Sequence, residues 1–577
     1  MAAKSNDFTP YKLLLMTLQQ VGKIITLPLA RSQLQVPDTS NEKLAAELLG
    51  HFHSPPSSPR GPAKCPFSAH FKTFAKPVVE ENNKINNNTK GQEVTVKPPQ
   101  PFAAMPRPKG LPVVGTLFDL MRSGAAPKIH MYCDKRHKEL GPIYCETLGS
   151  LEAVFVSDAA IIKHVFASEG RYPHHLIPEP WTIYNESSGN ERGLFFMNGP
   201  LWRARRRALN KVFLRRSAIS DHVEDFVNIT DDLMHRWTQM RDAKSLEVPD
   251  LERELYNWSI ECLGDFIFGR RMGCVSSGVS PPVVDDEIHT FVQSVQQIFV
   301  ESAKMTTVPP RLAYYLNLNV WKRFHSAVTS ALTIARSLVE NKIREIVVKA
   351  ETGEPVDGLL AKLLLEDKIE EEELVRIVTD LFLAAADTTS HSTQWALHLL
   401  AKNPKCQQQL RQEIDDVIPK GEDITFDKLC RLPYARAIVK EALRLYPVAP
   451  FLTRILTDDV VLGGYKVPKG KLVLMSMYTT GRDAQYFEQP DQFLPERWLP
   501  GSTTTTTAPP HASLPFGSGT RSCIGRRIAE TQMYLLLAQA VRHFDIESAN
   551  EQEVDITLRM VTTPSEPIRL RLLEREN

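Results

Sequence analysis

The chain has 577 residues, enough for several domains of average size or for one large enzyme fold, and its 42% hydrophobic and 24% charged residues are typical of a globular protein. The formal net charge of only +1 excludes bulk electrostatic attraction to nucleic acid, so a charged partner would have to meet a local patch. The eight cysteines are scattered and form no CxxC pair, which excludes a disulfide framework and a tetrahedral cysteine zinc site.

Residues 1–36 are predicted to be a mitochondrial transit peptide. From residue 8 to residue 37 there are three basic residues and no acidic residue, and apolar side chains from Leu14 to Ile25 fall on one helical face. The longest apolar run covers residues 13–16, whereas a helix that spans a bilayer needs roughly 20 apolar residues. The alternative is a basic tail without a targeting role.

Residues 37–104 are predicted to be a disordered linker, because the segment is rich in Pro, Ser and Asn and shows little apolar periodicity. Such a composition cannot bury enough apolar surface to offset the entropy that is lost on ordering. Order is expected to begin at residue 105, where Pro106 and Pro108 stiffen the chain. Residues 105–577 are therefore predicted to form one domain.

Between about residues 127 and 450 the apolar spacing is mostly that of helices. The longest predicted helix covers residues 371–404, with acidic residues at its start and Asn403-Pro404 at its end. Short segments of alternating polarity are predicted to be strands, and they cover residues 153–158, 460–470 and 471–478. The predicted fold class is mainly α (α+β), a helix-rich domain with a small β-sheet region.

The candidate functional site is the glycine-rich segment LPFGSGTRSCIGRR around Cys523 (residues 514–527). A phosphate-binding loop would need a Lys followed by Ser or Thr, and the segment has no such pair. A zinc site would need more cysteines or histidines at ligand spacing, and only His511 lies nearby. A nucleophilic cysteine stays open, because a histidine distant in sequence could act as its base.

A cysteine thiolate that binds haem iron accounts for every part of this segment. A helix predicted to begin at Cys523 would direct free backbone N–H groups at the sulfur and lower the pKa of the thiol. Glycines such as Gly519 and Gly525 would let the backbone approach the flat macrocycle closely. Arg521 can reach a haem propionate, and Phe516 can cover the sulfur.

The segment fits the pattern F-x-x-G-x-R-x-C-x-G, which is filled by Phe516, Gly519, Arg521, Cys523 and Gly525. This pattern resembles the haem-binding signature of the cytochrome P450 monooxygenases. The resemblance implies the cytochrome P450 fold for residues 105–577. It also implies haem b, with Cys523 as the axial ligand of the iron, and O2 as co-substrate.

Other segments resemble the same family and take their expected roles from it. KEALRLYP and FLPERW supply residues that the resemblance assigns to a buried structural network behind the haem: Glu441, Arg444 and Arg497. The W-x-x-x-R spacing in WRARR and an arginine ten residues after Arg444 imply contacts to haem propionates by Trp202, Arg206 and Arg454. For Arg454 the alternative is an ordinary charge at the edge of a sheet.

The AAADTTS segment within the long predicted helix resembles the oxygen-activating motif A-G-x-D/E-T of the family. The resemblance implies that Thr388 hydrogen-bonds the dioxygen or an ordered water, and that Asp387 connects this network to solvent. Ala385 stands where the motif has glycine and would fill part of the oxygen groove. The alternative for Thr388 is a hydroxyl that bonds back to its own helix.

Four basic residues are the candidate docking face for an electron donor, which is needed because the sequence has no flavin or nicotinamide domain: Arg436, Lys440, Arg526 and Arg527. This combination is similar to mitochondrial P450s. It implies an adrenodoxin-type ferredoxin with its NADPH-dependent reductase, and peripheral association with the matrix side of the inner mitochondrial membrane. The alternative is a solvated basic helix face without a partner.

Wider stretches resemble the insect ecdysteroid 2-hydroxylases within the mitochondrial P450s, and they cover residues 171–202, 442–456, 477–490 and 558–564. The resemblance implies conversion of 2-deoxyecdysone to ecdysone in moulting-hormone biosynthesis, in a pocket lined around Trp181, residues 447–452 and residues 561–562.

The alternatives within the family are action on another ecdysteroid position or on xenobiotics. A haem-thiolate isomerase or dehydratase and a non-catalytic haem sensor are the alternatives from other classes. The acid–threonine pair Asp387-Thr388 counts against the isomerase, which needs no proton delivery to oxygen.

Overall fold

The computed structural model describes residues 98–575, apart from gaps at 125, 150, 190–192, 276–285, 307, 355–357, 366–368, 370 and 502–507. The predicted transit peptide and all but the last seven residues of the predicted linker lie outside the described residues. Within the described part, no helix combines the length and the apolar character that crossing a membrane would require.

Regular structure in the described chain begins before residue 105. Strand β1 (Gln100–Pro101) pairs in parallel with β6 (Tyr465–Val467), and the 3-10 helix η1 (Phe102–Ala104) follows it. Residues 98–104 were predicted to be the end of the linker, so the boundary lies several residues earlier than the sequence indicated. The physical reason is that a two-residue strand has no periodicity, and its partner is more than 350 residues away along the chain.

The described chain is rich in helices, and its strands are short. The α-helices are α3 (Leu117–Arg122), α4 (Ile129–Leu140), α5 (Ala159–Ala167), α6 (Glu179–Ser188), α7 (Gly199–Phe213), α8 (Arg216–Ser220), α9 (Val223–Met240), α10 (Leu251–Phe268), α11 (Asp286–Lys304), α12 (Pro310–Tyr315), α13 (Asn319–Thr352), α14 (Leu359–Leu365), α15 (Glu371–Lys402), α16 (Pro404–Val417), α17 (Phe426–Leu429), α18 (Pro433–Leu445), α19 (Met477–Thr480) and α20 (Arg526–His543). The remaining strands are β2 (Ile143–Leu148), β3 (Leu151–Val156), β4 (Phe451–Ile455), β5 (Val460–Leu462), β7 (Leu472–Ser476), β8 (Phe544–Ser548), β9 (Ile556–Arg559), β10 (Val561–Pro564) and β11 (Leu570–Glu574).

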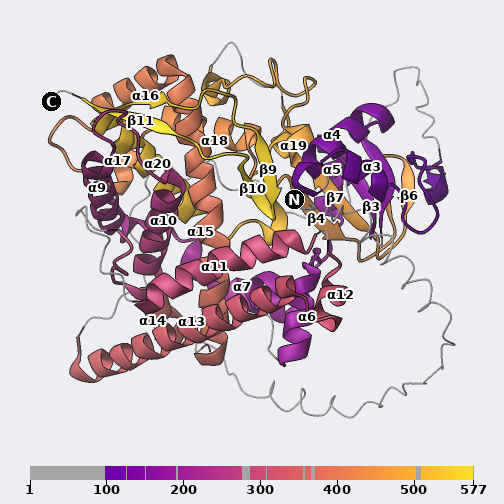
Figure 1. The fold of residues 1–577 in the computed structure, drawn as a ribbon, viewed down its shortest axis with the longest axis horizontal. Coiled ribbons are helices and arrows are strands. Elements are labelled where there is room, and N and C mark those ends of the chain that lie inside the picture. The colour runs from indigo at the N-terminus through magenta and orange to yellow at the C-terminus, as the bar shows by residue number, and fades with distance from the viewer. Residues whose placement is uncertain are drawn as a thin grey trace, which may run out of the picture. The chain divides into compact units, whose positions relative to one another are not determined.

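The strands form four small sheets, and the largest has the order β2-β3-β7-β4. In this sheet β3 and β7 are parallel and the outer pairs are antiparallel, and α3, α4 and α5 lie beside it (Figure 1). The predicted strand at residues 460–470 is a hairpin of β5 and β6 that turns at Gly463 and Gly464, both with positive φ. The predicted mainly α fold class with a small β region is confirmed.

Helix α15 is the central element of the helical part (Figure 1). It packs against α10, α13, α18 and α20, which explains why its middle is buried nearly all round, polar side chains included. Its bounds agree with the helix predicted at residues 371–404, because three successive glutamates begin it and Asn403 follows its last residue.

A buried carboxylate, Glu441 of α18, joins this helix to the 3-10 helix η4 (Pro495–Trp498). Its two oxygens accept from Arg444 Nε at 2.8 Å and Nη2 at 2.7 Å, and from Arg497 Nε at 2.9 Å. Trp498 Nε1 and the Leu494 backbone N–H add contacts at 2.9 and 3.1 Å. The side chains of Glu441, Arg444 and Arg497 have no exposed surface. The structure thus brings together the three residues predicted to form a buried network.

We expect Glu441→Gln to destabilise the protein by about 3–5 kcal/mol, because two buried arginines would lose their common counter-ion. The measurement is the free energy of unfolding of the haem-loaded protein in urea. Glu179→Gln is the matched control, since Glu179 pairs with Arg311 in an exposed ion pair and should change stability by less than about 1 kcal/mol. Equal denaturation midpoints for the two variants would contradict the role of Glu441.

Candidate functional site

The middle of α15 borders a space inside the fold. From Leu374 to Ala401 the side chains of this helix are buried, except for Arg376 near its start and three residues in its middle: Ala384, Ala385 and Thr388. Residues three and four positions apart share a helix face, so Ala384 and Ala385 both lie on the side of Thr388. Because these three are accessible while the residues before and after them are buried, this face lines a hollow.

Cys523 lies in an irregular loop that precedes α20. Its backbone N–H donates to the Phe516 carbonyl oxygen at 2.8 Å, and Ser522 N–H donates to Gly519 O at 3.2 Å, so the loop folds back on itself. The helix was predicted to begin at Cys523, but it begins at Arg526. The prediction of its start was wrong because the return to Phe516 keeps the backbone around Cys523 out of the helix.

Cys523 is exposed, so its thiol can be reached from a hollow in the protein. Protein atoms nevertheless surround the thiol on most sides. Burial raises the pKa of this thiol. The backbone N–H of Gly525 and the charges of Arg206 and Arg526 act in the opposite direction. A thiolate here is therefore partly stabilised by the protein, and a bound metal ion would complete its deprotonation.

Two arginines hold the cysteine loop from outside. Arg206 of α7 donates from Nη2 to the Ser522 carbonyl oxygen at 2.5 Å, directly beside Cys523. Arg454 of β4 donates from Nη2 to the Ser518 carbonyl oxygen at 3.4 Å. Both side chains are more than nine-tenths buried. Elements from distant parts of the chain thus place positive charge on the cysteine loop, and Arg206 acts on the sulfur itself.

A third arginine, Arg521, completes this cluster and stacks on the Trp202 ring with its guanidinium carbon 3.8 Å from the ring centroid. Its pKa is lowered to about 9, because burial and the charges of Arg454 and Arg206 disfavour its positive form. Glu169 supplies a carboxylate, which accepts from Arg454 Nε at 2.6 Å. Three positive charges less one negative charge leave an excess of two.

These residues fit a haem. The two propionates that haem carries would match the two uncompensated positive charges, and Cys523 offers one accessible sulfur to the iron. A Cβ added at Gly525 would meet no atom within 4 Å, so the space beside this residue is open. At Gly519 the opposite holds: φ is +73° and a Cβ would lie 2.3 Å from Glu169 Oε1, so only glycine fits there.

The acid–threonine pair lies on α15 with different surroundings for each member. The Thr388 hydroxyl donates to the Ala384 carbonyl oxygen at 2.7 Å, so in this structure it bonds back to its own helix on the accessible face. The Asp387 side chain is buried, and burial raises its pKa to about 6, against the charge of His391. Ser259 of α10 donates to the Ala385 carbonyl oxygen at 3.3 Å and fixes the helix at this point.

The four basic residues predicted to meet a partner differ in exposure. Lys440, Arg526 and Arg527 are exposed, and Arg526 pairs with Glu530 at 3.0 Å. Arg436 is half-buried and donates to the Cys430 carbonyl oxygen, so it points back to its own chain. Of the four residues predicted to meet a partner, Lys440, Arg526 and Arg527 are therefore the exposed ones.

Sequence reasoning missed Glu169 and Asn198. Glu169 neutralises Arg454, and Asn198 Oδ1 accepts from Arg521 Nη2 at 2.6 Å. Neither residue belongs to a motif, and each is more than 280 residues from its partner. No sequence signal could have identified them.

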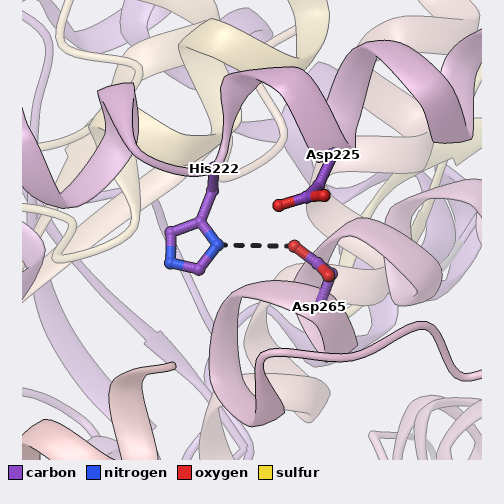
Figure 2. Close-up of side chains that lie close together, drawn as sticks. All are labelled: His222, Asp225 and Asp265. Atoms are coloured by element: carbon purple, nitrogen blue, oxygen red, sulfur yellow. Dashed lines mark hydrogen bonds and ion pairs between the residues drawn. The ribbon is translucent and has the colours of Figure 1, made fainter. Parts of the chain in front are cut away.

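Outside this site, His222, Asp225 and Asp265 bring metal-ligating atoms to within 4.8 Å of one another (Figure 2). Ligands of a tetrahedral zinc lie only about 3.3–3.6 Å apart, as follows from bond lengths of about 2.0–2.2 Å. His222 precedes α9, Asp225 lies in its first turn, and His222 Nδ1 contacts Asp265 of α10 at 3.4 Å. Helix-dipole stabilisation and a link between α9 and α10 account for this cluster.

Comparison with known proteins gives consistent results. The family model described as Cytochrome P450 matches residues 105–572. The chain is 40% identical over 486 residues to "Cytochrome P450 315a1, mitochondrial" of Drosophila melanogaster, across 82% of this chain and 89% of that protein. It is 33% identical over 519 residues to "Cytochrome P450 10" of Lymnaea stagnalis (89% and 91%). It is also 31% identical over 483 residues to "Sterol 26-hydroxylase, mitochondrial" of Rattus norvegicus (81% and 89%).

We expect Cys523→Ala to abolish the absorption band that a thiolate-ligated ferrous haem gives with carbon monoxide, because no sulfur would then reach the iron. The measurement is the reduced, CO-bound spectrum of the purified protein. Cys430→Ala is the control, since Cys430 is a partly buried residue that follows α17 and does not belong to the cysteine loop. This variant should leave the band unchanged. Persistence of the band in Cys523→Ala would show that another residue binds the iron.

Proposed function

The chain belongs to the cytochrome P450 family, and from this membership we propose that it hydroxylates a steroid, converting 2-deoxyecdysone to ecdysone. It is a mitochondrial haem-thiolate monooxygenase, so the resemblance seen in its sequence is confirmed at the level of the family and its mitochondrial group. Haem b supplies the iron at which O2 is activated for insertion of one oxygen atom into the substrate.

The residues of the site have separate roles in this proposal. Cys523 binds the iron, and Arg206, Arg454 and Arg521 hold the propionates through charge-assisted hydrogen bonds, with Trp202 stacked on Arg521. Phe516 and Gly519 shape the loop around the sulfur. These groups orient the cofactor and exclude water from its thiolate side.

Asp387 and Thr388 would move protons to oxygen when the haem is bound. Thr388 Oγ1 gives up its bond to Ala384 O when it donates to oxygen or to an ordered water, and Asp387 replaces the proton. The Asp387 carboxyl suits this task, because a pKa of about 6 lets it both hold and release a proton near neutral pH.

The observation that carries the steroid assignment is the arrangement of the segments that resemble ecdysteroid 2-hydroxylases. Thr562 donates from its hydroxyl to Pro447 O at 2.7 Å and from its N–H to Val448 O at 2.9 Å, so two of the expected pocket segments meet. Trp181 stacks on Phe196 with ring centroids 4.3 Å apart. Broad apolar surfaces of this kind suit a large, flat lipid.

A cavity of about 190 Å³ lies between α6, α13 and α15 and is lined in part by Trp181, Phe196 and Asp380. Asp380 is one helical turn before Ala384, so this cavity adjoins the accessible face of α15. The cavity also has hydroxyl groups in its wall, from Thr329, Thr333 and Thr379. A hydroxylated part of a steroid would suit such a mixed lining, and a cavity of this volume holds only part of such a molecule.

The electrons come, in this proposal, from an adrenodoxin-type ferredoxin that its NADPH-dependent reductase reduces. Lys440, Arg526 and Arg527 present the positive face that an acidic ferredoxin needs, and the last two follow the cysteine loop directly. Peripheral association with the inner mitochondrial membrane would give the enzyme access to a lipophilic substrate.

We expect the protein, reconstituted with ferredoxin, reductase, NADPH and 2-deoxyecdysone, to form ecdysone, with mass spectrometry as the measurement. Omission of ferredoxin is the control and should abolish turnover. A steroid hydroxylated at another carbon would refute the 2-position and keep the ecdysteroid class. No hydroxylated product from a protein with a normal CO-bound spectrum would refute the steroid assignment.

We expect Lys440→Glu and Arg527→Glu each to raise the KM for ferredoxin about fivefold at low salt, because each replaces an attractive charge with a repulsive one. The measurement is turnover at increasing ferredoxin concentration, and the difference should shrink as salt is added. Lys135→Glu is the control, since this exposed residue of α4 is not part of the docking face. Equal effects of all three variants would contradict a specific docking face.

A further inference from the structure

One turn beyond Asp387 on α15, a buried histidine connects the acid to the neighbouring helix α10. His391 is 4% exposed, and its Nδ1 lies 2.7 Å from the backbone carbonyl oxygen of Asp387. Its Nε2 lies 3.5 Å from Oε1 of Glu252, in the first turn of α10. The Glu252 side chain is 47% exposed, so the contact leads from the core to the surface.

The partners of His391 determine its protonation. A carbonyl oxygen can only accept, so Nδ1 must carry a hydrogen, and a carboxylate beside Nε2 favours a second one. Burial by itself disfavours the charged ring, but the contact with Glu252 and the negative charge of Asp387 outweigh it and raise the pKa of His391. The ring therefore stays positively charged up to a higher pH than the ring of a free histidine does.

Another buried histidine of the same helix shows what happens without such a partner. His398 is 1% exposed, and neither ring nitrogen has a hydrogen-bond partner among the residues that the structure describes. Burial lowers the pKa of His398 to about 4, so this ring is neutral. The two histidines lie two turns apart, and His391 differs from His398 in two contacts: that of Nδ1 with the Asp387 carbonyl oxygen and that of Nε2 with Glu252.

The charge on His391 acts on Asp387. Burial raises the pKa of the Asp387 carboxyl. The positive charge of His391 lowers this pKa, and the negative charge of Glu252 raises it further. Among the residues that the structure describes, Tyr256 of α10 also faces Asp387, and its pKa is raised well above its usual value, so it stays neutral. Arg559 acts on Glu252, whose own pKa is lowered, first of all by His391.

We propose that Glu252 and His391 are positioning residues that set the charge on Asp387, so that this buried acid exchanges protons at the pH at which the enzyme works. The inference rests on the role proposed above for Asp387 and Thr388, and it does not depend on which steroid is bound. Glu252 keeps His391 positively charged, and His391 keeps Asp387 from staying neutral in its buried position.

The test is to titrate the Asp387 carboxyl by infrared spectroscopy in the haem-loaded protein without substrate. The band of the protonated carboxyl is assigned by its loss in Asp387→Asn. In the unmodified protein we expect its midpoint near pH 6. In His391→Gln the midpoint should rise by about one pH unit, because the negative charge of Glu252 then lacks its counter-ion.

Glu252→Gln should raise the midpoint less than His391→Gln does. It removes the contact that keeps His391 charged, which raises the midpoint, but it also removes a negative charge near Asp387, which lowers it. This residue is at the surface, so the variant should fold normally. The double variant should behave like Glu252→Gln rather than like the sum of the two. His398→Gln, the matched control, should leave the midpoint unchanged, since that ring is already neutral.

A second readout is coupling, the fraction of NADPH electrons recovered in hydroxylated product, measured against pH. The pH at which coupling changes should shift to higher values, most in His391→Gln, less in Glu252→Gln and not at all in His398→Gln. An unchanged infrared midpoint in His391→Gln would overturn the proposal, and so would an equal rise in His398→Gln. If the protein fails to hydroxylate the steroid, the infrared titration still decides the matter, so the two proposals fail separately.

Discussion

Five donors converge on the buried carboxylate of Glu441, and the part of the chain that carries the cysteine loop depends on them. A carboxylate removed from water keeps its charge only where cations and N–H groups replace the lost hydration. This requirement fixes α18 against η4. Arg444 extends the link with donations to the carbonyl oxygens of Gly481 at 2.6 Å and Gln492 at 3.0 Å. The chain is thus fixed at several points before it reaches Cys523.

The charges around Cys523 follow the opposite rule. At Glu441 the positive and negative groups satisfy one another within the protein. Beside Arg206, Arg454 and Arg521, the described part of the chain provides one carboxylate, that of Glu169. Uncompensated charge in a partly buried place is costly, and it is tolerated where a ligand supplies the missing charge. Both the network at Glu441 and the cluster near Cys523 consist of arginines and a glutamate. They differ in net charge, which is compensated at Glu441 and positive near Cys523.

Local patterns could be predicted from the sequence, and distant pairings could not. The periodicity and glutamate-rich start of α15 are properties of adjacent residues, so this prediction holds closely. Residues 460–470 were predicted to be one strand, and they form a hairpin that turns at Gly463 and Gly464. Glu169 could not be predicted, because it meets Arg454 across 285 positions. The start of α20 was misplaced for the same reason: helix signals in the sequence contain no information on the bond from Cys523 N–H to Phe516 O.

Helix α15 shows how one element combines packing with chemistry. Most of its side chains fill the core, so a polar group on it is buried by default and stays neutral unless a neighbour compensates its charge. His398 has no such neighbour and is neutral, whereas Glu252 reaches His391 from α10. The contact between α10 and α15 that stabilises the fold therefore also decides which buried group on α15 carries a charge, and Asp387, one turn away, is the group that this charge affects.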